Sequence, residues 1–449
     1  MIYFLFLCFL ALLYFVYLKF NKDIIAPPFV LVGGYALSIL CAIANIDRWG
    51  IELHYNTVGV LLYGTLLFIV PSYFIKKFLE NKRKINNDNN EVTNIFTGIE
   101  LNFSYLKIYS FFQLLLLLIW LGMIYYIVSG IQSINSYSEM MTVFRIWSTN
   151  QTEWVNNYLF VFLNQFAQIT NCSAYLFMYI FIFNTFSHEY RYNKILIISI
   201  ILSIVQILLG GGRMGMLAIM FAGIMLYMVF YYQKFNKHFE INKKVICILL
   251  MSIVCGAILF TLSLAIARGG VISINGFLPY ITFYIGGAIQ GLDMFLQNPP
   301  LPSDIWGKET FWGLNFQLAR FGILDLELYK SHLEFRTAVT GARIGNIYTA
   351  YRSYIYDFGY WGLTILPVLF SSIISYWYYN FALKFKKINL SLLFYSLIFY
   401  TLFFDFARSC FFSFFSLALF KQFLVLLLLS LVFIKEFKIP NFNNLGGNL

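Results

Sequence analysis

Charged residues are scarce in this chain. Only 11% of its 449 residues are Asp, Glu, Lys or Arg, whereas 60% are hydrophobic and the mean hydropathy is +0.74. A soluble globular domain carries roughly 25% charged residues. So little polar surface cannot cover this many apolar side chains in water. The composition therefore excludes a soluble fold and predicts an integral membrane protein.

The patterns of several other protein classes are absent as well. Apolar and polar residues do not alternate over segments of about 10 residues, as a transmembrane β-barrel requires. The six cysteines form no C-x-x-C pair and the four histidines form no H-x-x-x-H pair. Neither a metal site nor another cofactor is therefore expected. No nucleic-acid partner is expected either.

The N-terminus lacks the features of a cleavable signal peptide. No basic residue precedes the apolar run that starts at Ile2, and no small-residue cleavage site follows it. The positive charges of Lys19 and Lys22 come after the run instead. This arrangement predicts a membrane anchor whose N-terminus lies outside.

Apolar runs of about 20 residues, the length of a membrane-spanning helix, recur along the whole chain. The expected fold class is an all-α polytopic integral membrane protein, with residues 1–449 in one membrane domain. We predict about eleven transmembrane helices, at residues 2–18, 27–45, 57–75, 108–128, 158–183, 195–209, 214–232, 245–266, 358–380, 390–407 and 411–434.

The lysines indicate the orientation, because loops rich in Lys and Arg stay in the cytoplasm. With the N-terminus outside, every lysine cluster falls on the cytoplasmic side, including the linker loop 76–107. The C-terminus is then cytoplasmic too. A large extracytoplasmic loop, residues 267–357, contains the apolar stretch 277–296. A proline and a pair of glycines in that stretch predict a re-entrant or interfacial helix rather than a further span.

Arginine is distributed differently from lysine. Of 20 lysines, 17 fall in the cytoplasmic loops, whereas nine of 11 arginines fall on the outer side. The planar guanidinium grips phosphate or carboxylate in two parallel hydrogen bonds, which the ammonium of lysine cannot do. The asymmetry predicts an anionic ligand at the outer membrane surface, such as a lipid phosphate or pyrophosphate. The nine arginines are Arg48, Arg145, Arg213, Arg268, Arg320, Arg336, Arg343, Arg352 and Arg408.

Three of these arginines lie in glycine turns at or near the membrane. Arg213 is in "GGGRMG", Arg268 in "ARGG" and Arg343 in "TGARIG". Glycine lets the backbone approach a ligand closely and lets amide groups point at an anion. The alternative for any single arginine is an interfacial anchor or a loop salt bridge.

A second dense stretch, "TGARIGNIYTAYRSYIYDFGYWGL" (340–363), leads from the outer loop into the ninth span. The aromatic belt of a membrane interface accounts for most of its tyrosines. It does not account for Asn346, Arg352 and Asp357 among them. Aromatic faces combined with polar groups also hold sugars, and Tyr348 and Tyr351 are candidates for that role together with Asn346.

The chain resembles the Wzy-type oligosaccharide repeat-unit polymerases, also called O-antigen polymerases. The resemblance rests on "GGGRMGML" between two spans, on "ARGG" closing the eighth span and on "TGARIGNIYTAYRSYIYDFGYWG" before the ninth. Many spans, a large late outer loop and outward arginines also match. As architecture it covers the whole chain, and as motifs about 40 residues.

The resemblance implies a metal-independent glycosyltransferase with a GT-C-like fold in the cytoplasmic (inner) membrane of a bacterium. Its substrates would be repeat units on undecaprenyl pyrophosphate, which it would join into the O-antigen of a lipopolysaccharide or into a capsule polysaccharide. A chain-length regulator and a flippase are implied as partners, besides membrane lipid.

Within that reaction, the leaving pyrophosphate would be held by Arg213, Arg268 and Arg343, with Arg352 or Arg408 assisting. Preorganised donors at a developing negative charge are usually the largest contribution to catalysis. The acceptor hydroxyl also needs a base within hydrogen-bond reach. The candidates for this base are Asp357, Glu334, Asp325 and His332.

Three other functions are alternatives. An O-antigen ligase shares the architecture and often has a histidine in the late outer loop, where this chain has His332 in "KSHLEF". A flippase or exporter of lipid-linked sugars would show inverted repeats and charges along a central cavity, and the sequence shows neither. A structural or sensory membrane protein would not need the three arginine turns.

Overall fold

The computed structural model describes residues 1–85, 96–149, 157–237, 264, 274–325, 333–413 and 415–437. The helices of the first half are α1 (Ile2–Lys19), α2 (Pro27–Ile43), α3 (Ile46–Trp49), α4 (Tyr55–Ile85), α5 (Phe103–Ser129), α6 (Tyr137–Thr149), α8 (Tyr158–Phe186), α9 (Asn193–Leu209) and α10 (Met214–Phe235).

The second half contains a two-stranded hairpin and further helices, several of them short. Its elements are α12 (Ile274–Gln297), α13 (Trp312–Arg320), β1 (Arg336–Thr337), β2 (Arg343–Gly345), α14 (Ala350–Trp377), the π-helix η1 (Tyr378–Ala382), α15 (Leu390–Ile398), α16 (Tyr400–Phe403), the 3-10 turn η2 (Phe404–Phe406), α17 (Cys410–Ser413) and α18 (Leu417–Phe433).

The protein is a helical, multi-pass membrane protein. Six of its helices are long and apolar enough to cross a membrane, namely α1, α4, α5, α8, α10 and α14 with η1, and four shorter apolar helical segments accompany them in the described ranges. Ten of the eleven predicted spans overlap these helices. The eighth, 245–266, lies largely outside the described residues. The number of crossings and the GT-C-like arrangement stay predictions.

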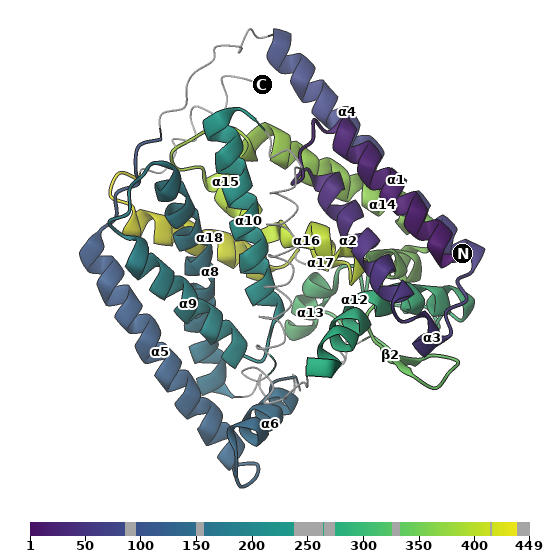
Figure 1. The fold of residues 1–449 in the computed structure, drawn as a ribbon. Coiled ribbons are helices and arrows are strands. Elements are labelled where there is room, and N and C mark those ends of the chain that lie inside the picture. The colour runs from purple at the N-terminus through teal and green to yellow at the C-terminus, as the bar shows by residue number, and fades with distance from the viewer. Residues whose placement is uncertain are drawn as a thin grey trace.

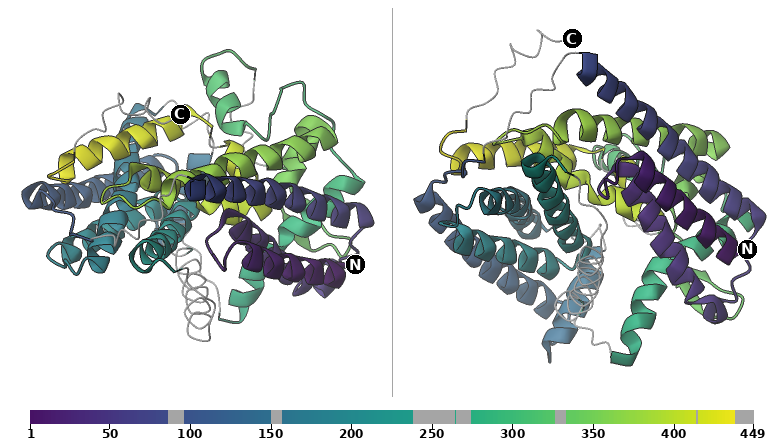
Figure 2. Two further views of the ribbon diagram at one scale, coloured as in Figure 1. Left: turned by 90° about the horizontal axis from the view of Figure 1, so that it is seen from above. Right: turned by 45° about the horizontal axis from the view of Figure 1, so that its top comes forward.

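The helices form two groups (Figure 1). In the first group, α2 packs against α1 and α12, and α14 packs along α4. In the second group, α8 packs against α9 and α10, and α5 packs against α9 and α6. The two further views in Figure 2 keep the purple α1 and α2 apart from the blue α5. Helix α18 contacts α8 and α5, and so belongs to the second group.

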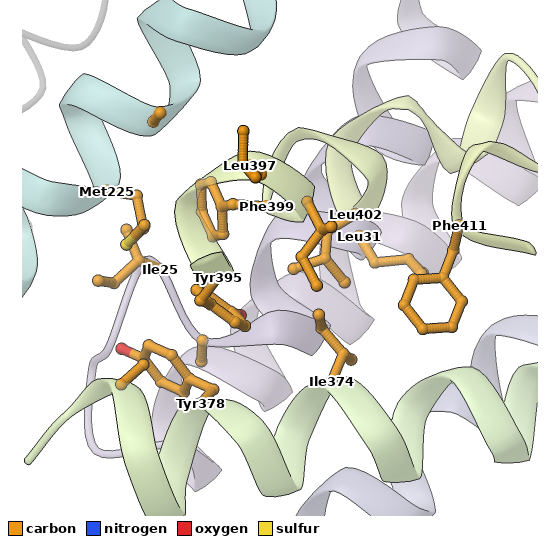
Figure 3. Close-up of a cluster of buried hydrophobic side chains, with 14 of the residues drawn as sticks. Ile25, Leu31, Met225, Ile374, Tyr378, Tyr395, Leu397, Phe399, Leu402 and Phe411 are labelled. Carbon is orange, nitrogen blue, oxygen red and sulfur yellow. The ribbon is translucent and has the colours of Figure 1, made fainter. Parts of the chain in front are cut away.

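The broken helix of α15, α16 and η2 joins the two groups. α15 and α16 contact α10, whereas α16 and η2 contact α2. Figure 3 shows the buried apolar cluster at this junction. Met225 comes from α10 and Tyr395 from α15. Ile374 comes from α14 and Tyr378 from η1. Lipid is as apolar as these side chains, so close packing rather than escape from water holds them together.

Glycine permits the closest helix contact. A Cβ on Gly286 of α12 would lie 2.5 Å from the backbone nitrogen of Ala42 in α2, a distance that real side chains do not tolerate. The Ser38 hydroxyl of α2 also donates to the Ile285 carbonyl at 2.7 Å. The stretch 277–296, expected to be re-entrant or interfacial, is thus part of a helix whose second half is packed against α2.

Two connecting regions differ from expectation. Residues 76–85 of the expected linker loop 76–107 are the last turns of α4, and the loop ends where α5 starts at Phe103. Phe96, just before α5, stacks on Phe183 with ring centroids 5.0 Å apart. The glycine turn between α9 and α10 is confirmed, with Gly211 at a φ of 79°.

Candidate functional site

Arg352 is the centre of a buried charge cluster at the start of α14. Its side chain is 2% exposed and forms an ion pair with Glu309, and Glu334 lies 3.8 Å from its second nitrogen. The guanidinium also lies 4.3 Å from the ring centroid of Tyr348 and 5.0 Å from that of Phe295. A buried cation held by two carboxylates and aromatic faces is compensated, as burial of a charge requires.

Glu309 and Asp357 hold the loop before α13 onto α14. Asp357 accepts hydrogen bonds from the backbone amides of Glu309 at 3.1 Å and Thr310 at 2.6 Å. Burial raises the pKa of Glu309 above its ordinary value, and the Arg352 guanidinium offsets part of that rise. Asp357, expected as a general base, is thus occupied by backbone donors and acts as an anchor for the loop.

The hairpin is tied to α12 through Arg336. This side chain donates to the Met294 carbonyl at 2.5 Å, to the Asn298 carbonyl at 2.8 Å and to the Glu334 carboxylate at 2.9 Å. Burial raises the pKa of Tyr348 to about 12, so its hydroxyl stays protonated and donates to the Glu334 carbonyl at 2.9 Å. The described residues 334–348 are therefore held against the end of α12.

The first connecting loop, between α2 and α4, packs on the same hairpin. The indole of Trp49 donates to the Arg343 carbonyl at 3.1 Å, and the Thr340 hydroxyl donates to the Arg48 carbonyl at 2.7 Å. The Arg48 guanidinium lies 5.3 Å from the ring centroid of Phe283 in α12. Segments almost 300 residues apart in the sequence thus form one surface.

Arg213 lies in a different setting, at the N-terminus of α10 directly after the glycine turn. It is 5% exposed, and one of its nitrogens donates to the Tyr280 hydroxyl at 2.8 Å. The guanidinium also lies 5.7 Å from the Tyr280 ring centroid and 5.5 Å from that of Tyr284, both on α12. The first half of α12 therefore holds Arg213, and its end holds the Arg352 cluster.

A cavity of about 180 Å³ is lined in part by residues that follow this arginine in the chain. Met214 and Gly215, the two residues after Arg213, form part of its wall. Asn171 and Gln422 contribute polar groups from α8 and α18. The Oδ1 atom of Asn171 is buried with no hydrogen-bond partner among the described residues. The cavity is thus apolar in large part but able to accept a polar group.

A third polar cluster joins α12 to the start of α4. The buried carboxylate of Asp293 accepts from the His54 amide at 2.9 Å and from the Thr57 hydroxyl at 2.5 Å. Its other oxygen lies 3.0 Å from Nδ1 of His54. Among the described residues, no group of three His, Cys, Asp or Glu side chains has the arrangement to hold a metal ion.

The expected site residues fall into separate places. Arg352 and Tyr348 are in contact, and Asp357 lies in the same cluster. Tyr351 instead points into the packed interface of α14 with α2 and α4, where it stacks on Tyr35 at 5.3 Å and shares a hydrogen bond with Thr65 at 3.2 Å. Tyr351 and Tyr348 are each 1% exposed, so this arrangement gives neither ring access to a sugar.

The remaining expected residues lie at the surface or outside the described ranges. The side chains of Arg343, Arg408 and Asp325 are exposed. Asn346, in the segment between β2 and α14, is half-buried. Glu334 pairs with Arg336 and Arg352. Arg268 and His332 lie outside the described residues.

Sequence reasoning missed the partners that these residues find in the fold. Glu309, Tyr280 and Tyr284 lie in the large loop as one acidic residue and two aromatic residues among many. His54 and Asp293 are 239 residues apart. A lone histidine directly before a predicted span was a usable signal for His54, whereas the pairings themselves depend on how α12 crosses α2 and α4.

Comparison with protein-family models, with curated proteins and with solved structures finds no match to this chain.

Proposed function

We propose that the protein is a metal-independent membrane glycosyltransferase that polymerises oligosaccharide repeat units carried on undecaprenyl pyrophosphate. The product would be an O-antigen or a capsular polysaccharide, made at the outer face of the bacterial cytoplasmic membrane. The proposal combines the resemblance in the arginine turns with a multi-pass helical fold and with the setting of Arg213.

The observation that carries the proposal is the position of Arg213. A helix N-terminus offers unpaired amide donors and the positive end of the helix dipole, which together favour an anion. Arg213 adds a guanidinium at that place, and Tyr280 and Tyr284 fix its orientation. A glycine turn precedes it, so a ligand can approach the backbone closely. This arrangement suits a pyrophosphate that leaves as the glycosidic bond breaks.

The adjacent cavity supports a lipid-linked substrate in particular. Two of its lining residues, Met214 and Gly215, follow Arg213 directly, and the others include residues of α8, α9 and α18. A pyrophosphate at Arg213 would leave its attached lipid next to apolar helix faces. Its sugars would extend toward the surface formed by the hairpin, where Arg343 is exposed.

The contacts in the Arg352 cluster change the roles that we propose for three residues. Arg352 is neutralised by Glu309 and Glu334, and Asp357 is occupied by two backbone amides. We therefore assign both to holding the outer loop in shape and keep Arg213, with Arg343 and Arg268, for the pyrophosphate. Tyr348 is 1% exposed, its ring lies against the Arg352 guanidinium and its hydroxyl donates to the Glu334 carbonyl, so we assign it to the same loop-holding cluster. Asn346 remains the residue proposed to face the sugars.

The experiment is a gel of surface glycan from a strain that lacks this chain. The strain is complemented with the wild type, with Arg213→Ala or with Arg320→Ala. Arg320 is an exposed arginine at the end of α13 and serves as the matched control. Wild type and Arg320→Ala should restore a polymer ladder, whereas Arg213→Ala should leave single repeats.

Other patterns on that gel identify the alternatives. Polymer stranded on its lipid carrier in the strain lacking the chain indicates a ligase, and single units stranded on the carrier inside the cell indicate a flippase. An unchanged glycan in that strain contradicts any role in the pathway. A full ladder with Arg213→Ala, at wild-type protein level, contradicts the role of Arg213.

A further inference from the structure

The two carboxylate oxygens of Asp293 contact different groups. One oxygen accepts from the His54 amide and the Thr57 hydroxyl, and so caps the start of α4. The other lies 3.0 Å from Nδ1 of the His54 imidazole. A cap alone requires only the first set of contacts. The second contact orients a histidine ring, which a helix start does not need.

Nδ1 of the His54 imidazole contacts the Asp293 carboxylate, and the side chain as a whole is accessible from the surface. Its side chain is 54% exposed, whereas Asp293 is 3% exposed. Because an ionised carboxylate only accepts hydrogen bonds, the tautomer that matches this contact carries its proton on Nδ1 and leaves Nε2 able to accept. A buried carboxylate that fixes the tautomer of an accessible imidazole is the arrangement that general-base histidines require.

The pair also lies next to the charge cluster of the large loop. The last turns of α12 carry Asp293 and, beside it, Met294 and Phe295, which contact Arg336 and Arg352. A Cβ on Gly291 would lie 2.8 Å from the Ile347 carbonyl, so the segment before α14 runs directly along this helix. His54 is thus held at the end of α12, beside which the segment that contains Asn346 runs.

We propose that His54 is the general base of the transfer reaction and that Asp293 is the residue that positions it. The inference rests on the proposed function and names a residue that the late outer loop does not contain. Nε2 of His54 accepts the proton of the acceptor hydroxyl while that oxygen forms its bond to the anomeric carbon. The bond from that carbon to the pyrophosphate oxygen breaks, and the pyrophosphate leaves with the electron pair. Asp293 stabilises the resulting imidazolium.

The test uses the full chain, purified and reconstituted in lipid vesicles. The substrate is the pool of lipid-linked repeat units extracted from the strain that lacks the chain. Positioned general bases contribute about 10²–10⁴-fold to rate, so His54→Ala should lose polymerisation by a factor in that range. Added imidazole should restore part of the lost rate, because the side chain is half exposed and its removal opens a ring-sized space.

Controls separate the base from a structural role. Thr57→Val removes one donor from Asp293 but keeps the ring, and it should retain most of the activity. His188→Ala changes an exposed histidine after α8, whose ring lies against Tyr190, and should behave as wild type. In a series of substituted imidazoles, the rescued rate of His54→Ala should rise with the basicity of the added imidazole.

The test of Asp293 requires a measurement that a purely structural role of this residue would not change. Asp293→Asn should lower the wild-type rate, yet it should not lower the imidazole-rescued rate of His54→Ala further, because its effect passes through His54. Equal losses in both backgrounds overturn its positioning role.

The outcomes also distinguish the two proposals. If the wild type forms no polymer, the proposed function fails. If the wild type polymerises, Arg213→Ala is inactive and His54→Ala is unchanged, only the inference fails. A folded, monodisperse His54→Ala protein that is inactive at every imidazole concentration overturns the inference as well.

Discussion

Two arginines of this protein are buried to a similar extent but held by different partners. Arg352 is 2% exposed and pairs with the carboxylates of Glu309 and Glu334, whereas Arg213 is 5% exposed and is oriented by Tyr280 and Tyr284. Removing an arginine from buried carboxylates leaves a buried charge behind. The contacts of Arg213 described above are with tyrosines, and its removal leaves those groups neutral. The first arginine therefore serves mainly the fold, and the second can be changed to probe function.

The largest effect is expected at the buried ion pair. Arg352→Ala should lower the free energy of unfolding by about 3–5 kcal/mol, because Glu309 then stays buried without its partner. Thermal unfolding of the purified protein in detergent, followed by tryptophan fluorescence, measures the loss. The double variant Arg352→Ala with Glu309→Ala should recover part of it, and equal stability of the single and double variants would contradict the pairing.

A smaller effect is expected at the kink that separates the Arg352 cluster from the rest of α14. Gly359 has a φ of 62° and a ψ of −156°, a region that only glycine occupies readily. Gly359→Ala should cost about 1–3 kcal/mol by the same unfolding measurement. Gly122→Ala in α5 is the matched control, since a Cβ there meets no atom within 4 Å. Equal behaviour of the two variants would show that the kink is not strained.

The variant Tyr280→Phe tests how Arg213, in contrast to Arg352, depends on a neutral hydrogen-bond partner. The change removes the hydrogen bond at 2.8 Å but keeps the ring against the guanidinium. Hydrogen bonds to charged groups contribute about 1.5–3 kcal/mol when both partners are intact. Because Tyr280 is only half-buried, we expect a smaller loss here, of about 1 kcal/mol or less. The polymer ladder should persist with shorter chains. Complete loss of polymer would mean that the hydroxyl itself contacts the substrate.

The smallest effect on stability is expected at Arg343. Its side chain is exposed, and the hairpin is held through its backbone carbonyl rather than its guanidinium. Arg343→Ala should therefore change the free energy of unfolding by no more than about 0.5 kcal/mol. If Arg343 helps to hold the pyrophosphate, the same variant should still shorten the polymer ladder, so stability and function separate at this position.

Much of the helical fold could be predicted because hydropathy reports directly on helices that face lipid. Spans 2–18 and 214–232 agree with α1 and α10 within a few residues. The prediction was poorer for α14, which begins at Ala350 rather than near residue 358. Polar residues such as Arg352 lower the hydropathy of the first turns of α14, so hydropathy does not indicate where the helix starts. These residues are tolerated there because partners elsewhere in the chain, such as Glu309, compensate their charges.

The candidate site was predictable in part. The glycine turn identified Arg213 as unusual, and the dense stretch before the ninth span contained Arg352 and Tyr348. The sequence did not show that Glu309 neutralises Arg352 or that Tyr351 packs in the interior. Both depend on long-range contacts, and no local pattern reports which face of a helix meets which neighbour.

The sequence by itself determined that the chain resides in a membrane, where its helices are found and which of its arginines lie in glycine turns. Hydrophobicity and backbone freedom are local properties, so a linear reading suffices for them. The tertiary structure alone decided that α12 lies against α2, since only glycine at position 286 lets the two backbones approach so closely. That crossing brings Asp293 to His54 and Tyr280 to Arg213, and so it gathers residues that are far apart in the sequence into two polar clusters along one helix.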